Sequence, residues 1–144
     1  MQLSSVRRYG GVRNYGPDIT STSLIHASDR SYGTITNPSD DNTATYIQNF
    51  TYCSIDFVEV KRIGKFGFYS LNSYTLSNAK LGVFQGSNNN VAWDTLVPLA
   101  NMEIDVGWNY IEFENPYFYR YYRVSGFPKN NNSVLEEWEM FEIQ

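Results

Sequence analysis

The sequence predicts an all-β fold, an antiparallel β-sandwich. Three observations favour it: short runs of aromatic and β-branched residues alternate with polar turns, aromatic residues make up 17% of the chain, and no run has the apolar period of a helix. The stretch 81–143 is the densest in such runs. Each run there is expected to form a short strand of a sandwich, namely 81–85, 108–113, 117–124 and 135–143.

Length and composition set broad limits. The chain has 144 residues, of which 42% are hydrophobic; this supports one folded domain, expected over 24–144 after an arm over 1–23. A net charge of -4 argues against nucleic acid as the main partner. The small basic cluster of Arg7, Arg8 and Arg13 is interpreted as a solvated part of the arm rather than as a phosphate site. No apolar run is long enough for membrane insertion, and the N-terminus lacks the apolar centre of a signal peptide.

The N-terminal segment 1–23 is polar, has no period and carries turn signals at Gly10-Gly11 and Gly16-Pro17-Asp18. It is expected to be extended, and to lie either on its own sandwich or against a neighbouring subunit. A short apolar run follows at Leu24-Ile25, then a polar loop, and a strand is expected to begin near Thr45.

The run 54–69 shows partial alternation of apolar and polar residues. Ile55 and Phe57 share one face, and so do Phe66 and Phe68. These apolar side chains are expected in the core.

Residues 86–90 have the composition of a tight turn, because Gly and Asn tolerate the positive φ that such turns require. Gly86 is expected to permit a sharp exit from the strand, and Trp93 to fill the space between the sheets. Arg120 and Arg123 alternate with aromatic residues on a central strand, where arginine can stack and form ion pairs. Trp93, Arg120, Tyr121 and Trp138 are interpreted as scaffold.

Four segments, in their order along the chain, resemble the galactose-binding-like jelly rolls: the discoidin or coagulation-factor type C domains and the related carbohydrate-binding modules. The segment 54–68 is similar to the family's IDLG strand and the apolar strand after it. The segment 85–96 is similar to its GSxDGxxWxxL turn, 120–124 to its RYxRI strand, and 135–140 to its closing strand. The resemblance covers 40–143 and implies a jelly-roll sandwich.

The chain departs from the family pattern at two places. Val58 replaces the usual Gly of the first segment, and Asn89 and Asn90 replace the Asp-Gly of the turn. These changes keep the hairpin but weaken the argument for a specific ligand.

The resemblance also implies a structural calcium ion in a loop before the first long strand. The closest match to that loop is 40–45, and 29–34 is second. Calcium takes roughly six to eight oxygen ligands. The expected ligands are Asp40, Asp41, Asn42, Thr45 and, from the last strand, Glu137. The alternative is an ordinary Asx-turn loop without an ion.

Sugar binding in such modules uses loops at one end of the sandwich, where an aromatic ring stacks on the sugar and polar side chains bind its hydroxyls. The candidate ligand-binding residues come from three loops and are His26, Arg30, Tyr32, Asn89, Asn90 and Trp108. The alternative for His26 is an ordinary loop histidine.

An enzymatic role is not expected. The single cysteine and single histidine leave Cys53 and His26 as the one nucleophile–base pair, and Cys53 is expected to be buried in a strand. The carboxylate pairs are adjacent in sequence, so on a strand they point to opposite faces.

One functional hypothesis and two alternatives follow. The hypothesis is a non-catalytic structural and adhesion subunit of a larger particle, a virion or phage surface component that displays the sandwich for recognition of host-surface glycans. Such a subunit would be oligomeric and contact its neighbours through the N-terminal arm, with the virion surface as its location. The alternatives are a stand-alone lectin-like module, made in the cytoplasm and then extracellular, and a purely architectural capsid or tail accessory protein.

Overall fold

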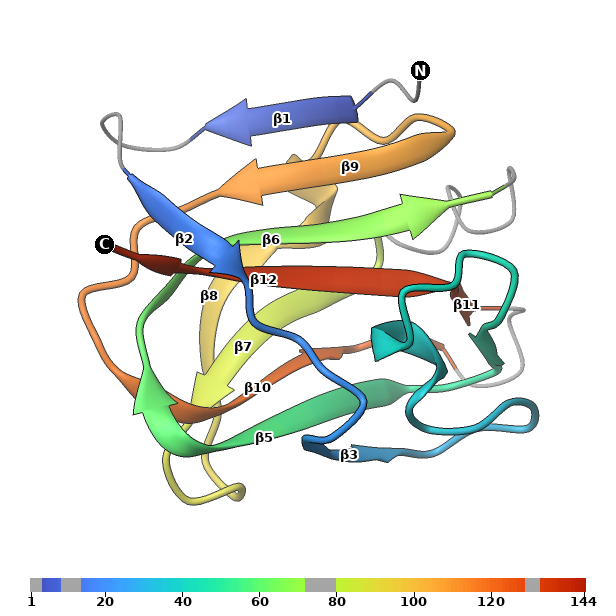
Figure 1. Cartoon of the computed structure of the whole chain (residues 1–144), viewed down its shortest axis with the longest axis horizontal. Helices are drawn as coiled ribbons and strands as arrows, with labels where there is room; N and C mark the ends of the chain where they lie inside the picture. Colours follow the sequence, from blue (N-terminus) through green and yellow to red (C-terminus); the bar gives the residue numbers. More distant parts are fainter. Residues whose placement is uncertain (1–3, 9–13, 72–79, 129–132) are drawn as a thin grey trace.

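Two five-stranded sheets lie face to face in the computed structural model, which describes residues 4–8, 14–71, 80–128 and 133–144 (Figure 1). The predicted all-β antiparallel sandwich is confirmed. Within these ranges the helical segments are two single 3-10 turns, η1 (Asn37–Ser39) and η2 (Leu99–Asn101). The described part of the chain thus holds no helix long and apolar enough to cross a membrane.

Sheet A is built from both ends of the chain. Its strand order is β1 (Ser4–Arg8), β9 (Gly107–Glu112), β6 (Ile63–Ser70), β12 (Glu137–Ile143) and β2 (Tyr15–Asp18). β1 runs parallel to β9, and the other neighbours are antiparallel. The described parts of the predicted arm are therefore the two edge strands of this sheet, so they lie on their own sandwich. The predicted turn at Gly16-Pro17-Asp18 lies within β2, and the one at Gly10-Gly11 lies outside the described residues.

Sheet B is antiparallel throughout. Its strand order is β3 (Ile25–Ser28), β5 (Tyr52–Lys61), β10 (Tyr119–Ser125), β7 (Val83–Ser87) and β8 (Asp94–Pro98). β10 is the central strand, as predicted for the stretch that carries Arg120 and Arg123. A separate two-stranded ribbon joins β4 (Ile47–Gln48) to β11 (Val134–Leu135).

The run 54–69 forms two strands, one in each sheet, because the chain changes sheets between Lys61 and Ile63. Asn115 stabilises this corner by donating from Nδ2 to the Ile63 carbonyl at 2.9 Å. The Tyr122 hydroxyl donates to the Lys61 carbonyl at 2.7 Å and accepts from the Ile63 N–H at 3.2 Å. The buried polar groups of the corner are thus satisfied, as burial requires.

Phe84 lies at the centre of the core. Its ring centroid is 4.6 Å from that of Phe66 in sheet A, 5.7 Å from Tyr122 and 5.5 Å from Phe113. Phe66, Phe68, Ile55 and Phe57 are all at most 5% exposed, which confirms the predicted core positions. Since each fully buried aromatic side chain contributes about 1.5–3 kcal/mol, this cluster holds the two sheets together.

Trp93 does not fill the space between the sheets, so that prediction is wrong. It is half-buried, and the Arg123 guanidinium lies 4.1 Å from its ring centroid on the outer face of sheet B. The reason is a register shift: Phe84 pairs with Val97, but Gln85 pairs with Thr95, so one residue of β8 is skipped. A single inserted residue moves the side chains beyond it to the opposite face.

The role predicted for Gly86 is also wrong. Gly86 lies inside β7, where a Cβ would come within 2.5 Å of the Tyr119 ring, so glycine makes room for that ring. The left-handed residue of the following turn is Asn90, with φ 59°.

Candidate functional site

His26 lies in the interior and not in a loop. It is on β3, it is 6% exposed, and neither ring nitrogen faces solvent. Its Nε2 is 2.9 Å from Ser39 Oγ, and the same hydroxyl accepts a hydrogen bond from Trp138 Nε1 at 2.6 Å. Burial lowers the pKa of His26 and keeps the ring neutral. The loop-histidine interpretation is therefore wrong, and the geometry does not support His26 as a sugar ligand.

The loop after β3 presents a stacked aromatic pair, in which Tyr32 is exposed and Tyr46 is half-buried. The Tyr32 ring stacks on Tyr46 with centroids 5.0 Å apart, and Tyr32 is 56% exposed. The loop is fixed against β4, since the Ser31 N–H donates to the Gln48 carbonyl at 3.0 Å and the Gln48 N–H donates to the Tyr32 carbonyl at 3.2 Å. Gly33 has φ 91°, and a Cβ there would overlap the Tyr46 carbonyl. Only glycine fits this position, which fixes the path of the loop.

Arg30 lies beside the tyrosine pair and is exposed. Its Nε donates to the Gly33 carbonyl at 2.5 Å, which orients the guanidinium along the loop. Asp29 anchors the base of the loop by accepting from the Thr51 N–H at 2.8 Å and the Tyr52 N–H at 3.2 Å. Burial raises the pKa of Asp29, but these hydrogen bonds outweigh it and hold the pKa below its usual value. Asp29 thus has a structural role in the loop that is the second match to a calcium site.

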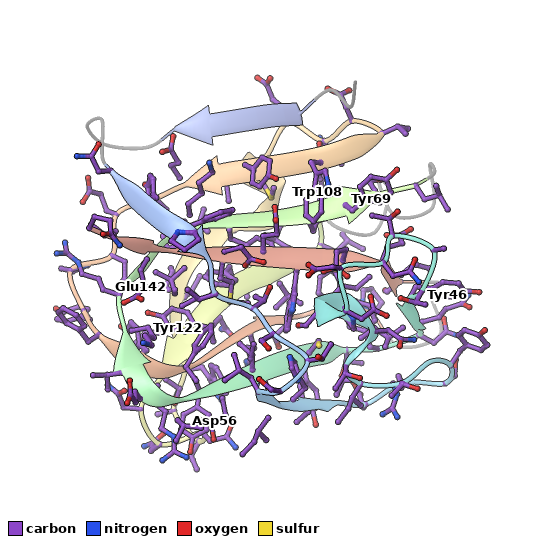
Figure 2. The ribbon with its side chains drawn as sticks, viewed as in Figure 1. Tyr46, Asp56, Tyr69, Trp108, Tyr122 and Glu142 are labelled. Atoms are coloured by element: carbon purple, nitrogen blue, oxygen red, sulfur yellow. The ribbon has the colours of Figure 1, made fainter. Side chains whose placement is uncertain are left out.

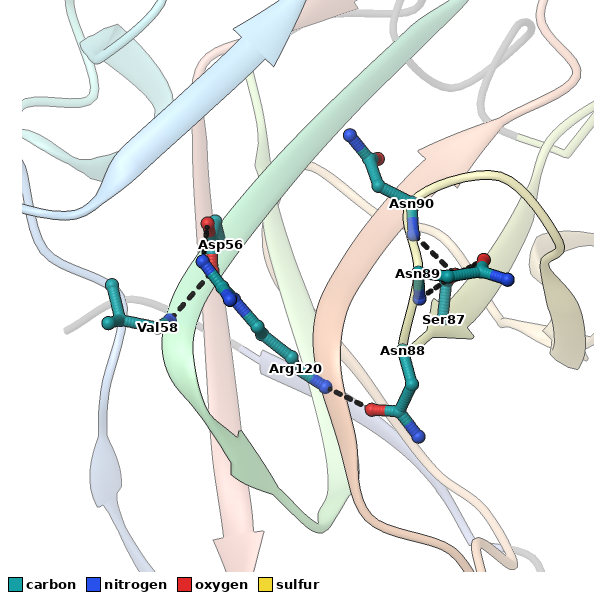
Figure 3. Close-up of polar contacts among 7 residues, drawn as sticks. All are labelled: Asp56, Val58, Ser87, Asn88, Asn89, Asn90 and Arg120. Atoms are coloured by element: carbon teal, nitrogen blue, oxygen red, sulfur yellow. Dashed lines mark hydrogen bonds and ion pairs between the residues drawn. The ribbon is translucent and has the colours of Figure 1, made fainter.

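The asparagines after β7 form a turn at the other end of sheet B (Figure 3). Asn89 Oδ1 accepts from the Val91 N–H at 2.9 Å, and Asn88 Oδ1 accepts from the Arg120 N–H at 2.9 Å. Asn90 supplies the left-handed backbone conformation. The amide oxygens of Asn88 and Asn89 therefore hold the turn together, as expected for asparagine in this setting.

Trp108 lies on the outer face of sheet A. Its ring meets Tyr69 edge-on at 5.7 Å and lies nearly parallel to Tyr110 at 5.9 Å. Figure 2 shows Trp108 and Tyr69 together over sheet A, apart from Tyr46 and from Asp56.

The predicted ligand-binding residues do not converge on one site. In β10, Tyr121 pairs with Ser87, which leads into the asparagine turn, whereas Ser125 pairs with Tyr52, next to the Arg30 loop. Four residues of extended strand separate these two places by about 13 Å. The structure thus groups Arg30 with Tyr32, Asn89 with Asn90, and leaves His26 and Trp108 elsewhere.

Sequence reasoning missed Tyr46 as a member of the aromatic pair. It precedes β4 in an irregular segment, so no periodic pattern marks it. An isolated bridge between Tyr32 and Gln48 brings the two segments together.

The loop 40–45 does meet the last strand. The Asp41 N–H donates to Glu137 Oε2 at 3.3 Å. Asp40 accepts from the Thr45 hydroxyl at 2.6 Å and from the Asn42 N–H at 2.9 Å. The structure places the loop 40–45 against Glu137 through the Asp41 backbone, and the loop has the Asx-turn contacts of the alternative interpretation.

Glu137 is the residue of this site whose pKa is most affected by burial. It is 1% exposed, and its Oε1 has no hydrogen-bond partner among the described residues. Burial raises the pKa of Glu137 to about 9, and the neighbouring Asp40 and Asp41 carboxylates act in the same direction. A buried carboxylate oxygen without a donor is a position that a cation would stabilise. In the described ranges no three Asp, Glu, His or Cys side chains are placed to hold a metal, so Asn42, Thr45 or backbone oxygens would have to complete the set.

Comparison with known proteins identifies the fold. No protein-family model matches the chain, and no curated protein matches its sequence. Solved structures do match: CBM62 from Clostridium thermocellum Xyl5A is similar at a TM-score of 0.72 and 21% identity, covering 89% of this chain and 98% of that chain. The chain folds as a galactose-binding-like jelly roll.

Two further jelly rolls give the same result. The lectin domain of lectinolysin complexed with Lewis b antigen has a TM-score of 0.63 and 18% identity, covering 87% of this chain and 96% of its own. CBM32 of AlyQ in complex with 4,5-unsaturated mannuronic acid has a TM-score of 0.66 and 12% identity, covering 89% and 98%. The fold that the sequence resemblance implies is confirmed.

Proposed function

We propose that this jelly roll is a non-catalytic carbohydrate-binding domain that binds a glycan at the loop end formed by Arg30, Tyr32 and Tyr46. One observation carries the proposal: the exposed Tyr32 ring, stacked on the half-buried Tyr46, lies beside an exposed guanidinium on a loop that its own hydrogen bonds hold in place. The similar structures include complexes with sugars, which supports the same class of ligand here.

The chemistry of this loop end suits a sugar. The apolar face of a pyranose ring can stack on an aromatic ring, and the guanidinium and tyrosine hydroxyls can bind its hydroxyl groups. The loop is held against β4 before a ligand arrives, so little conformational entropy is lost on binding.

The non-catalytic part of the proposal rests on Cys53. This residue is fully buried, and burial raises the pKa of its thiol far above the usual value. A thiol without solvent access and without thiolate character is not a nucleophile.

The proposal is tested by glycan binding of the variants Tyr32→Ala and Tyr46→Ala. Each is expected to weaken binding about tenfold or more while the protein stays folded. Val106→Ala is the control, because Val106 is 59% exposed and lies just before β9, outside this loop end. Equal binding by all three variants and the wild type would rule out this loop end as the site.

We also propose that the loop 40–45 and Glu137 hold a structural calcium ion. The unpartnered Glu137 Oε1, next to Asp40 and Asp41, supports the assignment. When bound, the ion would supply positive charge that allows Glu137 to be ionised in the folded state. Asp40, Asp41, Asn42, Thr45 and Glu137 are the side chains that would hold it.

For the biological setting, we propose an oligomeric adhesion subunit on the surface of a larger particle, such as a virion or phage. An apolar surface at the end of sheet B near Asp56 supports a subunit contact. We name it the hairpin-end patch; strand pairing places its members at this end of sheet B, and they are Ile25, Val58, Val60, Val91, Tyr117 and Phe118, each 55–82% exposed. Exposed apolar side chains gathered in one place are typical of protein interfaces.

Light scattering of the purified chain tests this setting. We expect an oligomer that Val91→Glu converts to a smaller species, while Leu81→Glu, at a position 52% exposed outside the patch, leaves it unchanged. A wild-type monomer at high concentration would contradict the subunit contact.

A further inference from the structure

Arg123 occupies the centre of the outer face of sheet B and forms no ion pair with a carboxylate. All fifteen Asp and Glu residues of the chain lie in the described ranges, and none of them pairs with Arg123 there. The contrast with Arg120 is clear: that guanidinium binds Asp56 through two hydrogen bonds, at 2.8 and 2.9 Å (Figure 3). Arg120 and Arg123 lie on one strand, but only the charge of Arg120 is neutralised by a carboxylate.

The Arg123 guanidinium is nevertheless held in a defined orientation. Its Nε donates to Gln85 Oε1 at 2.7 Å, and its centre lies 4.1 Å from the Trp93 ring centroid. Gln85 is itself oriented, because its Nε2 donates to Thr95 Oγ1 at 3.1 Å. One edge of the guanidinium is therefore used by the protein, and its two terminal NH2 groups bind no atom of the described residues.

The strand register shows what surrounds this group. Arg123 pairs with Gln85 on one side and with Ser54 on the other, and Ser54 pairs with Ala27. This row carries small side chains on the β5 and β3 side of Arg123, and Tyr52, two residues before Ser54 on β5, lies near enough to act on the Arg123 charge. Tyr121 lies on the same face of β10, two residues before Arg123, and is half-buried. Half-burial also lowers the pKa of Arg123, since its charge loses part of its hydration.

We propose that the outer face of sheet B is a second glycan-binding site, and that Arg123 binds there the carboxylate of an acidic sugar such as a uronic acid residue. A planar guanidinium with two terminal NH2 groups forms a pair of parallel hydrogen bonds with a carboxylate. The Trp93 ring lies against the guanidinium, Gln85 fixes its rotation, and the neighbouring Tyr121 ring carries the Arg120 guanidinium 5.0 Å from its centroid. The inference rests on the proposed function, because it names an acidic class of sugar and a site apart from the Arg30 loop.

The test compares a galacturonate oligosaccharide with its fully methyl-esterified counterpart by calorimetry, using the wild type, Arg123→Gln and Arg123→Lys. The wild type is expected to bind the free acid more tightly than the ester, and to lose affinity as salt is raised. Arg123→Gln should lose about 10- to 100-fold in affinity for the acid, since a hydrogen bond to a charged group is lost. Arg123→Lys should lose less affinity, because it keeps the positive charge but cannot form two parallel hydrogen bonds. If Arg123→Gln does not fold, Arg123→Lys replaces it in the comparison. Lys80→Gln, which removes an exposed cation elsewhere, should bind as the wild type does.

Any of four results would overturn the inference, and the first three are equal affinity for acid and ester, unchanged affinity in Arg123→Gln, and equally tight binding of poly-glutamate. Sulfated oligosaccharide is included as a separate probe, and tighter binding of sulfate than of carboxylate would also count against it. Tyr32→Ala separates the two proposals. If neutral glycans bind the wild type and not Tyr32→Ala, while Arg123 variants are indistinguishable from the wild type, the second site is wrong and the proposed function stands.

Discussion

Replacing Glu137 with Gln should make the calcium-free protein more stable at neutral pH. Glu137 is 1% exposed, and burial raises its pKa from 4.5 to about 9 in the folded state. Because the folded pKa is the higher one, the contribution of Glu137 to stability is complete below pH 4.5 and is lost as the pH rises toward 9. Gln keeps the shape of the side chain and has no charge to lose.

The size of the effect follows from the pKa difference. Each pH unit between the two pKa values changes the free energy of unfolding by at most about 1.4 kcal/mol, so the interval from pH 4.5 to pH 7 lowers it by up to about 3 kcal/mol. For a domain of this length, that corresponds to a difference of about 10 °C in Tm. At pH 4 the variant and the wild type should melt at the same temperature.

The assay is thermal melting of both proteins from pH 4 to pH 9, with chelator and again with calcium. In calcium the difference at pH 7 should narrow: the wild type gains about 2.7 kcal/mol at one hundred times the dissociation constant, which offsets most of the roughly 3 kcal/mol deficit, and the Gln variant gains little. Glu59→Gln is the control, because the Glu59 side chain is 78% exposed, so its melting should follow the wild type. Parallel melting curves for the wild type and Glu137→Gln at every pH would refute the electrostatic reasoning. If calcium stabilises the wild type and Glu137→Gln equally, Glu137 is not a calcium ligand.

Three further predictions concern packing and the glycan site. Ser39→Ala removes the acceptor of the buried Trp138 Nε1, so urea unfolding should show a loss of about 2–4 kcal/mol; a loss below about 0.5 kcal/mol would contradict the role of this hydroxyl. Gly67→Ala places a Cβ against the Tyr110 ring, so we expect a lower Tm and a loss of about 1–3 kcal/mol, and an unchanged Tm would show that the ring moves freely. Tyr32→Ala should change the free energy of unfolding by no more than about 0.5 kcal/mol, since the ring is 56% exposed, while glycan binding falls; destabilisation instead would assign the ring a structural role.

The fold could be predicted from the sequence because it depends on local signals that the chain repeats. Alternation placed Ile55, Phe57, Phe66 and Phe68 in the core, and the central strand was marked by arginines between aromatic residues. Trp93 was misplaced because a register shift in β8 has no local signature, and a shift of one residue reverses the face of each side chain beyond it.

The candidate sites were predictable only in part. The loop 40–45 and Glu137 were named through the family pattern, and the structure shows the Asp41 N–H donating to Glu137 Oε2 at 3.3 Å; calcium binding there stays a prediction. The predicted ligand-binding residues could not be grouped correctly from the sequence, because the order of the strands in the sheets decides which loops lie close together. His26 was assigned to a loop although β3 extends through it, and Tyr46 becomes part of the aromatic pair only through a bridge between distant segments.

The central claim is that this jelly roll binds glycans, and a broad glycan array probed with the wild-type chain tests it most directly. The account predicts selective binding to a small set of glycans, and a Tyr32→Ala chain that loses those signals. An array without selective binding, measured both with calcium and with chelator on protein shown to be folded, would contradict the account.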